Sequence, residues 1–175
     1  MATTKWVIDP THSEIQFKVK HLVISTVTGY FRTFEGSVET ETEDFDGATV
    51  EFSADTASVD TNQAQRDEHL KSGDFFESEK HPKLSFTGKL AKTGSESYTL
   101  KGDLSVKGIT KPFEFAVEYG GSMTDFYGNN KSGFEVTGKI NRKEFGLEWS
   151  AVTEAGGVVV GDEVKLIANI QVVKQ

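Results

Sequence analysis

Residues 98–119, YTLKGDLSVKGITKPFEFAVEY, show most clearly which fold this sequence specifies. Apolar or small residues occupy every second position on both sides of Lys107-Gly108: Tyr98, Leu100, Gly102, Leu104, Val106, Phe113, Phe115, Val117 and Tyr119. A period of two is typical of β-strands with one buried face. Lys107-Gly108 supplies residues that tolerate the positive φ angles of a tight turn. The stretch therefore predicts two antiparallel strands joined by a turn.

The same alternation continues along the chain and predicts eight strands. They cover about residues 12–20, 30–40, 48–55, 84–90, 98–107, 113–119, 134–140 and 164–172. Residues 62–72, NQAQRDEHLKS, instead predict a short helix, capped by Thr61 or Asn62 and ending near Gly73. We expect an all-β fold of one domain, residues 1–175: an eight-stranded antiparallel barrel, because closure removes exposed strand edges. A two-layer sandwich is the alternative that alternation leaves open.

The composition narrows the classes of function. The formal net charge of -8 argues against a nucleic-acid partner and against a polybasic grip on anionic lipid headgroups. The chain has no cysteine, which excludes disulfides, thiolate metal sites and a cysteine nucleophile. No apolar run reaches the roughly 20 residues of a membrane-spanning helix, and the N-terminus shows no signal peptide. We expect no transmembrane segment and, for the chain as given, a cytoplasmic location, or a periplasmic one if a leader has been removed.

Small residues recur on the inward faces of the predicted strands: Gly36, Ala54, Gly88, Gly102, Gly138 and Ala168. Such residues either let strands kink so that the barrel closes or leave a lumen for a ligand, and the sequence leaves both interpretations open. An eight-stranded barrel has room inside for one slender ligand. The residues predicted to bind it are Phe17, Val19, Phe34, Gly36, Val38, Phe52, Ala54, Leu70, Phe75, Phe76, Phe86, Gly102, Leu104, Phe113, Phe115, Phe134, Val136, Gly138, Ile140 and Arg142.

Two features mark the expected mouth of this barrel. Phe75-Phe76 follows the predicted helix, where it acts either as a plug of the core or as a gate for a ligand. Arg142 has two interpretations as well. It pairs with Asp60, Asp67 or Asp74, or it is a cation that meets a polar headgroup.

Several polar residues could carry chemistry. Asp9, His12 and Ser13 contain the groups of a nucleophilic triad, but neighbouring strand residues point to opposite faces, so a polar network around the N-terminal turn is the competing interpretation. His69, His81, Asp67 and Asp74 lack the spacing of a metal site. No nucleophile elbow or glycine-rich phosphate loop occurs. We expect neither a metal nor a cofactor other than a bound long-chain isoprenoid or lipid.

Motifs along nearly the whole chain are similar to those of one family. They are Asp9-Pro10-Thr11-His12-Ser13, Gly29-x-Phe31-x-x-Phe34-x-Gly36, Arg66-Asp67-x-His69-Leu70-x-Ser72-x-Asp74-Phe75-Phe76, Gly102-x-Leu104-x-Val106-x-Gly108, Arg142-x-x-Phe145-Gly146 and Val160-Gly161-Asp162-x-Val164. With these motifs the chain resembles the YceI-like family. The resemblance implies an extended, lipocalin-like barrel whose tunnel binds polyisoprenoid chains, isoprenoid quinones or fatty-acid derivatives.

The resemblance makes a binding or carrier protein the leading expectation, with a long-chain polyisoprenoid or fatty-acid-like partner. Many members of the family begin with a signal peptide; none is visible in residues 1–9, so we expect a periplasmic role only if a leader has been removed. An enzyme acting on a lipid or isoprenoid is the second hypothesis, with Asp9, His12, His21, Asp67 and His69 as candidate groups. It requires at least two of them to meet at the tunnel mouth. A ligand-free interaction domain is the third hypothesis, and a homodimer stays open.

Overall fold

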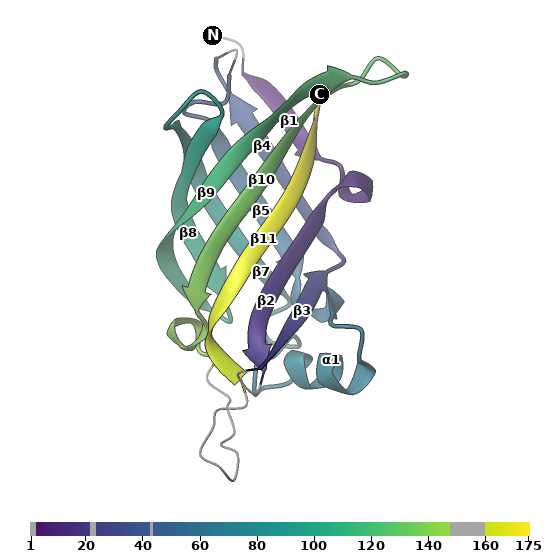
Figure 1. The fold of residues 1–175 in the computed structure, drawn as a ribbon, viewed down its shortest axis with the longest axis vertical. Helices are drawn as coiled ribbons and strands as arrows, with labels where there is room; N and C mark the ends of the chain where they lie inside the picture. Colours follow the sequence, from purple (N-terminus) through teal and green to yellow (C-terminus); the bar gives the residue numbers. More distant parts are fainter. Residues whose placement is uncertain (1–2, 22–23, 43, 148–159) are drawn as a thin grey trace.

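A computed structural model describes residues 3–21, 24–42, 44–147 and 160–175, which form a closed antiparallel β-barrel with one short helix (Figure 1). The strands are β1 (Thr4–Ile8), β2 (Glu14–His21), β3 (Ser25–Phe31), β4 (Phe34–Thr40), β5 (Thr49–Asp55), β6 (Val59–Asp60), β7 (Lys83–Lys92), β8 (Ser97–Val106), β9 (Ile109–Thr124), β10 (Asn130–Asn141) and β11 (Val160–Lys174). The helix is α1 (Ala64–Lys71), and 3₁₀ turns are η1 (Pro10–His12), η2 (Thr56–Ser58) and η3 (Arg142–Phe145). We call the end of the barrel near α1 the lower end and the opposite end the upper end.

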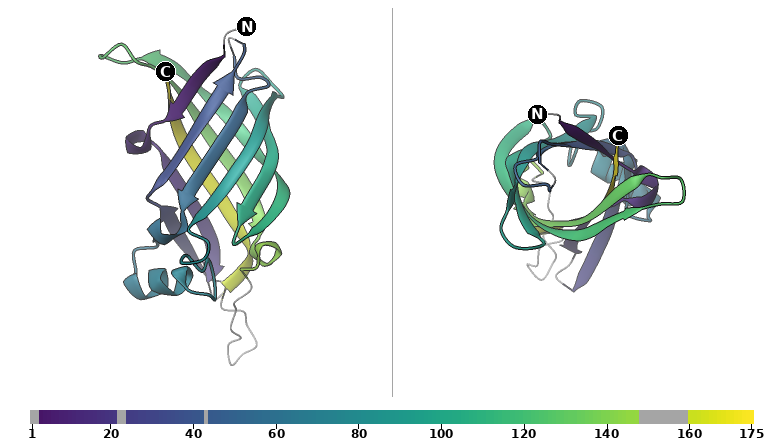
Figure 2. Two further views of the ribbon diagram at one scale, coloured as in Figure 1. Left: turned by 180° about the vertical axis from the view of Figure 1, so that it is seen from behind. Right: turned by 90° about the horizontal axis from the view of Figure 1, so that it is seen from above.

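The sheet closes through its first strand. β1 pairs with β4 on one side and with β11 on the other, and the remaining strands follow in the order β4-β5-β7-β8-β9-β10-β11. β2 continues along β11 below η1, and β3 pairs with β2, so β1–β2 and β3–β4 are two of the eight barrel strands, each interrupted once. Seen from above, the strands form a ring (Figure 2). The predicted eight-stranded barrel is therefore confirmed, and the two-layer sandwich is wrong.

The predicted elements differ from the structure mainly at their ends. The strand predicted over residues 30–40 is broken at Arg32-Thr33, because Arg32 N turns to bond the carbonyl of Ser58 at 3.2 Å. The helix begins two residues later than predicted. Its N-cap is Gln63, whose side chain accepts from Arg66 N at 2.6 Å, while Asn62 adopts a left-handed φ of 64°. Neither Thr61 nor Asn62 is the cap.

The inward glycines are places where neighbouring atoms approach closely. Gly88 lies directly opposite Gly102, and a Cβ on either residue would collide with the backbone of the facing strand. A Cβ on Gly36 would lie 2.6 Å from Ile8 Cδ1 and 2.9 Å from the carbonyl oxygen of Glu51. At Gly138 it would meet the ring of Phe115 at 2.8 Å. These glycines therefore let the strands bend and pack tightly, and the interpretation that they leave a lumen is wrong.

A bulge in β9 separates the barrel from a projecting hairpin. Phe134 pairs with Tyr119 and Gly133 with Gly121, so Gly120 is the extra residue in β9. Gly121 has a φ of 113°, which favours glycine. Because bulges bend strands, we attribute to this bulge the direction in which the top of the β9–β10 hairpin leaves the barrel (Figures 1 and 2).

Candidate functional site: an apolar cavity in the barrel

A cavity of about 230 Å³ lies inside the barrel. Its described walls carry Ile8, Ile15, Phe17, Val19, Phe31, Val38, Val50, Phe52, Leu70, Phe75, Phe76, Leu84, Phe86, Leu90, Leu100, Leu104, Val106, Phe115, Val117, Phe134, Val136, Ile140, Leu147, Val164, Leu166, Ala168, Ile170 and Val172. Arg142 is the charged side chain that is buried among them. Gln16, Ser37 and Glu51 alternate with inward residues and so contribute mainly backbone. The interior thus offers an almost wholly apolar surface.

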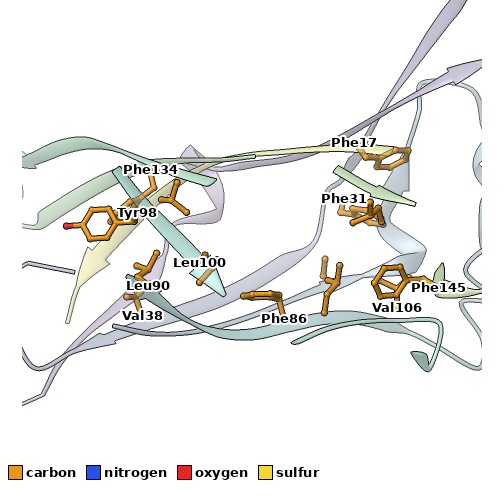
Figure 3. Close-up of a cluster of buried hydrophobic side chains, with 14 of the residues drawn as sticks. Phe17, Phe31, Val38, Phe86, Leu90, Tyr98, Leu100, Val106, Phe134 and Phe145 are labelled. Atoms are coloured by element: carbon orange, nitrogen blue, oxygen red, sulfur yellow. The ribbon is translucent and has the colours of Figure 1, made fainter. Parts of the chain in front are cut away.

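The buried side chains extend along the barrel (Figure 3). Phe17, Phe31, Val106 and Phe145 gather toward one end, and Tyr98, Phe134, Leu90 and Val38 toward the other, with Phe86 and Leu100 between the two groups. The rings form contacts along the way: Phe86 and Phe115 have centroids 5.2 Å apart, and Phe17 and Phe31 5.5 Å. The cavity is therefore a narrow, aromatic-lined space rather than a broad pocket.

The structure brings most of the predicted ligand-binding residues to this wall. Those on the wall are Phe17, Val19, Val38, Phe52, Leu70, Phe75, Phe76, Phe86, Leu104, Phe115, Phe134, Val136, Ile140 and Arg142. Those away from it are Phe34, Gly36, Ala54, Gly102, Phe113 and Gly138, because they contact neighbouring strands or rings. Which of them touch a ligand stays a prediction. Leu90, Leu100 and Val117 were missed, although the period of two already placed them on the inward face.

A cluster of aromatic rings closes the upper end. Phe45, from the loop between β4 and β5, is 4% exposed and stands edge-on to Phe134 with ring centroids 4.9 Å apart. Trp6 and Tyr119 flank Phe45 at 5.3 Å and 6.0 Å. Above these rings lies an open cup of about 360 Å³ with mixed polar and aromatic walls, including Asp44 and Trp6. Phe45 lies in a polar loop, and no sequence pattern predicted this role.

The segment around α1 closes the lower end. Leu70, Phe75 and Phe76 line the cavity there, and Phe76 stands edge-on to Phe31 at 5.6 Å. Of the two interpretations of Phe75-Phe76, this packing favours the core plug. Side chains hold the segment in shape: Asp67 accepts from the Thr61 backbone N–H at 2.8 Å and from its hydroxyl at 2.5 Å.

Further bonds extend these ties. Arg66 Nε donates to Thr61 Oγ1 at 2.7 Å, and His69 Nε2 lies 2.8 Å from Asp74 Oδ2. Lys107, in the turn between β8 and β9, donates from Nζ to the carbonyl of Gly73 at 2.9 Å. The bonds of Arg66, Asp67 and His69 therefore fix the shape of the segment, and the bond of Lys107 joins it to the barrel.

Arg142 is a buried clamp at the lower end. It is 2% exposed, and its guanidinium donates to the carbonyls of Leu147, of Gly161 at 2.8 Å and of Val160 at 3.3 Å. Burial lowers the pKa of Arg142. The carboxylate of Asp162, 3.9 Å away, opposes this shift, and the arginine stays charged.

The predicted pairing of Arg142 with Asp60, Asp67 or Asp74 is wrong. These carboxylates bond Arg32, Thr61 and His69 instead. The contacts of Arg142 join η3 to the start of β11, while its position on the cavity wall leaves the headgroup role a prediction.

The candidate catalytic groups lie in separate local networks. Asp9 Oδ2 is 2.8 Å from His12 Nδ1, but Ser13 Oγ accepts from the backbone of Gln171 at 2.9 Å, so the structure supports a polar network around η1. Asp67 and His69 belong to α1 at the lower end, far from η1 (Figure 1). The side chain of His21 lies outside the described part. Within the described ranges no cluster of acidic or histidine residues could hold a metal ion.

Hydrogen bonds depress one carboxyl in the network at η1. The Thr11 hydroxyl, His12 and the Thr11 backbone N–H hold the pKa of Asp9 well below its usual range, against the opposing effect of burial. Lys131 lies 3.6 Å from Asp9 and 3.4 Å from Asp125, so it connects η1 to the turn of the β9–β10 hairpin. The carboxylate of Asp9 therefore acts as a structural acceptor.

The closed antiparallel barrel and its apolar cavity define a lipocalin-like class of protein, in which such barrels hold one small ligand. The chain belongs to the YceI-like family, since the model of the YceI-like domain matches residues 6–172. A UPF0312 protein of Staphylococcus aureus (strain USA300) is 38% identical over 169 residues, 96% of each chain. A UPF0312 protein of Staphylococcus epidermidis is 37% identical over the same length.

Solved structures share this fold. BcnA of Burkholderia cenocepacia superposes with a TM-score of 0.81 at 19% identity, covering 94% of this chain and 98% of its own. The Campylobacter jejuni YceI protein gives 0.76 at 29% identity, with 89% and 90% covered. A polyisoprenoid-binding domain from Saccharophagus degradans gives 0.70 at 14% identity, with 97% and 98% covered. None of the helices in the described ranges is long and apolar enough to cross a membrane.

Proposed function

We propose that this protein binds and carries one long-chain amphiphile, a polyisoprenoid, an isoprenoid quinone or a fatty-acid derivative, in the cavity of the barrel. The observation that carries the proposal is the nearly uninterrupted apolar wall, which runs from Phe134 near the upper end to Phe76 at the lower end. A linear hydrocarbon gains about 0.8 kcal/mol per buried methylene, and such a wall offers no polar partner along most of its length. The polyisoprenoid-binding domain of Saccharophagus degradans, which shares the fold, supports this choice of ligand.

The size of the cavity refines the proposal. Its volume of about 230 Å³ is smaller than the roughly 300 Å³ at which most small-molecule pockets begin. A long chain therefore needs the rings on the wall to turn as it enters. Because the wall is rich in phenylalanine, whose ring can rotate about two side-chain bonds, we expect the bore to widen along its axis as the chain is taken up.

The first test is chemical. Organic extraction of the purified protein, followed by mass spectrometry, is expected to release a long-chain lipid in a fixed molar ratio. The second test is a titration with geranylgeraniol, an isoprenoid alcohol. Protein that yields no lipid and does not bind geranylgeraniol contradicts the proposal.

A substitution on the wall should block uptake without unfolding the barrel. Ala168 lies on the cavity wall in β11, whereas Gly102 does not, so Ala168→Leu adds side-chain volume to the cavity. We expect it to weaken geranylgeraniol binding at least about tenfold, since the added volume takes the place of several methylenes. Asn169→Leu, on the outward face of the same strand, is the matched control and should bind as the wild type does.

A further inference from the structure

The β9–β10 hairpin carries exposed aromatic rings at its tip. Phe126 and Tyr127 have relative exposures of 105% and 89%, and Met123 on the same hairpin 62%. In the described part of the chain, the other large apolar side chain with such exposure is Ile24, at 88%. The hairpin projects beyond the upper end, so its tip is among the outermost parts of the molecule (Figures 1 and 2). Exposed apolar groups concentrated at one projecting point indicate a contact site.

The turn that presents these rings is firmly built. Asp125 Oδ1 accepts from the backbone N–H of Tyr127 at 2.9 Å and of Asn129 at 3.0 Å. The Asp125 N–H donates to the carbonyl of Asn129 at 3.0 Å, and Gly128 N–H donates to the carbonyl of Asp125 at 3.1 Å. The backbone of the tip thus has internal partners for these polar groups, which lowers the cost of placing it in an apolar medium. A preformed turn also loses little freedom on docking.

The tip carries almost no net charge. Asp125 is the charged residue between positions 122 and 130, and Lys131 lies 3.4 Å from it. Both side chains of this ion pair are shielded, at 17% and 18% relative exposure. The whole chain, in contrast, has a formal charge of -8. The tip is therefore matched to an uncharged surface, and it lacks the basic cluster that anionic lipids attract.

We propose that Phe126 and Tyr127 insert into the interfacial layer of a zwitterionic lipid bilayer and dock the upper end of the barrel there. Two aromatic side chains cover about 150–250 Å² each, well short of the roughly 800 Å² that each partner gives to a stable protein complex. A bilayer requires no such complementary surface, and aromatic side chains favour its interface. The area and the charge together select a lipid surface over a protein partner.

Docking in this orientation brings the cup at the upper end toward the bilayer. Met123, Thr124 and Asn130 of the hairpin line that cup. Below it, Phe45 and Phe134 separate the cup from the apolar cavity. A lipid leaving the bilayer at this end would therefore pass through the cup and meet the rings of Phe45 and Phe134 before it reaches the cavity. The docking goes beyond the proposed binding function, and either can fail without the other.

The test uses the full chain and vesicles of pure phosphatidylcholine in a flotation assay. We expect the wild type to float with the vesicles and the double variant Phe126→Ser, Tyr127→Ser to lose at least about tenfold in bound fraction, because aromatic burial supplies the affinity. Ile24→Ser removes an equally exposed apolar side chain and should bind as the wild type does. Added phosphatidylglycerol should not strengthen binding, given the negative charge of the chain.

Two controls keep the interpretation clear. Circular dichroism and thermal unfolding should show that the double variant folds as the wild type does, since its changes lie on an exposed turn. Ala168→Leu, which blocks the cavity, should still float. A wild type that does not float, or a double variant that floats equally well, overturns the docking. So does wild-type protein that self-associates without vesicles through the tip, because the tip then binds a second copy.

Discussion

The two ends of the barrel are closed by different kinds of contact. At the lower end, hydrogen bonds of Asp67 and Arg66 to Thr61 shape the segment around α1, and Lys107 joins that segment to the β8–β9 turn. At the upper end, the space is closed by the ring of Phe45, which packs edge-on to Phe134. A hydrogen bond of this kind contributes about 0.5–1.5 kcal/mol and depends on direction. A ring that turns aside loses only packing contacts.

This difference indicates at which end the barrel can open. Moving the lower segment off the barrel breaks the Lys107–Gly73 bond and removes three side chains, Leu70, Phe75 and Phe76, from the cavity wall together. Moving Phe45 requires only its side chain to rotate, while the loop backbone keeps its bond from Gly47 N to the Leu90 carbonyl at 2.8 Å. We therefore expect ligands to enter and leave through the upper end, the end at which the projecting hairpin lies.

The largest effect is expected at the lower end, for Arg142→Met. The change removes the partner of the Leu147, Gly161 and Val160 carbonyls, so we expect the free energy of unfolding to fall by about 3–5 kcal/mol. Urea unfolding measures it. Lys143→Met is the control, because that half-exposed lysine shares Asp162 at 3.3 Å and should contribute less than about 1 kcal/mol. Equal losses in both variants would mean that Arg142 is not a clamp.

The second prediction compares the two plugs directly. Phe45→Ala and Phe76→Ala each remove a buried ring and should cost about 2–4 kcal/mol in stability. Their effects on ligand exchange should differ. We expect Phe45→Ala to speed the uptake of cis-parinaric acid, a fluorescent long-chain fatty acid, about tenfold in stopped-flow experiments, since it clears the upper end, and Phe76→Ala to change uptake much less. Faster uptake in Phe76→Ala than in Phe45→Ala would place the port at the lower end.

The asymmetry itself could not be predicted from the sequence, although the barrel could. A period of two shows which residues face inward, and it correctly placed Leu104, Phe86 and Val136 on the wall. It cannot show what stands opposite an inward residue. Gly102 in β8 pairs with Gly88 in the neighbouring strand β7. Only this register shows that a Cβ at either position would meet backbone and not empty space.

The ends of the barrel were harder to predict because they depend on contacts between distant segments. Phe45 lies among polar residues, and its role depends on Trp6 and Phe134, which come from other strands. The break between β3 and β4 likewise depends on Arg32, which bonds Asp60 at 3.0 Å and lies over the ring of Tyr30. The contacts of Phe45 and of Arg32 produce no alternating pattern in the sequence. The prediction therefore continued one strand through the break between β3 and β4, and it gave no role to the loop that carries Phe45.

The third prediction concerns the hydrogen bonds of Thr61 in the segment that closes the lower end. Thr61→Val keeps the shape of a side chain that is 4% exposed but removes the hydroxyl shared by Asp67 and Arg66. We expect a loss of about 1–2 kcal/mol and faster hydrogen exchange in α1 than at the upper end. Thr42→Val, on the exposed upper loop, is the control and should change stability by less than about 1 kcal/mol. Unchanged exchange in α1 would mean that the hydroxyl does not hold the segment.

The smallest effect on stability is expected in the upper half of the barrel, where Lys131 forms ion pairs with both Asp9 and Asp125. The pKa of Asp9 is lowered in the folded state, mainly by the Thr11 hydroxyl and His12, so folding favours the ionised carboxylate. Its stabilisation is complete above the unfolded pKa near 4 and is lost as the pH falls below it toward the folded pKa. Asp9→Asn should therefore cost about 1–2 kcal/mol at pH 6 and less in acid.

The measurement is urea unfolding of wild type and Asp9→Asn at several pH values between about 6 and 3. Only the difference between the two proteins is informative, because Asp44, Asp60 and Asp125 also have lowered pKa values and steepen both curves. We expect the two curves to converge in acid, and amide exchange around Lys131 to rise there before exchange in α1 does. Parallel curves would show that Asp9 does not stabilise the fold through its charge. The closure of the upper end would then rest on the packing around Phe45 and on the hydrogen bonds of its loop, without a contribution from the charge of Asp9.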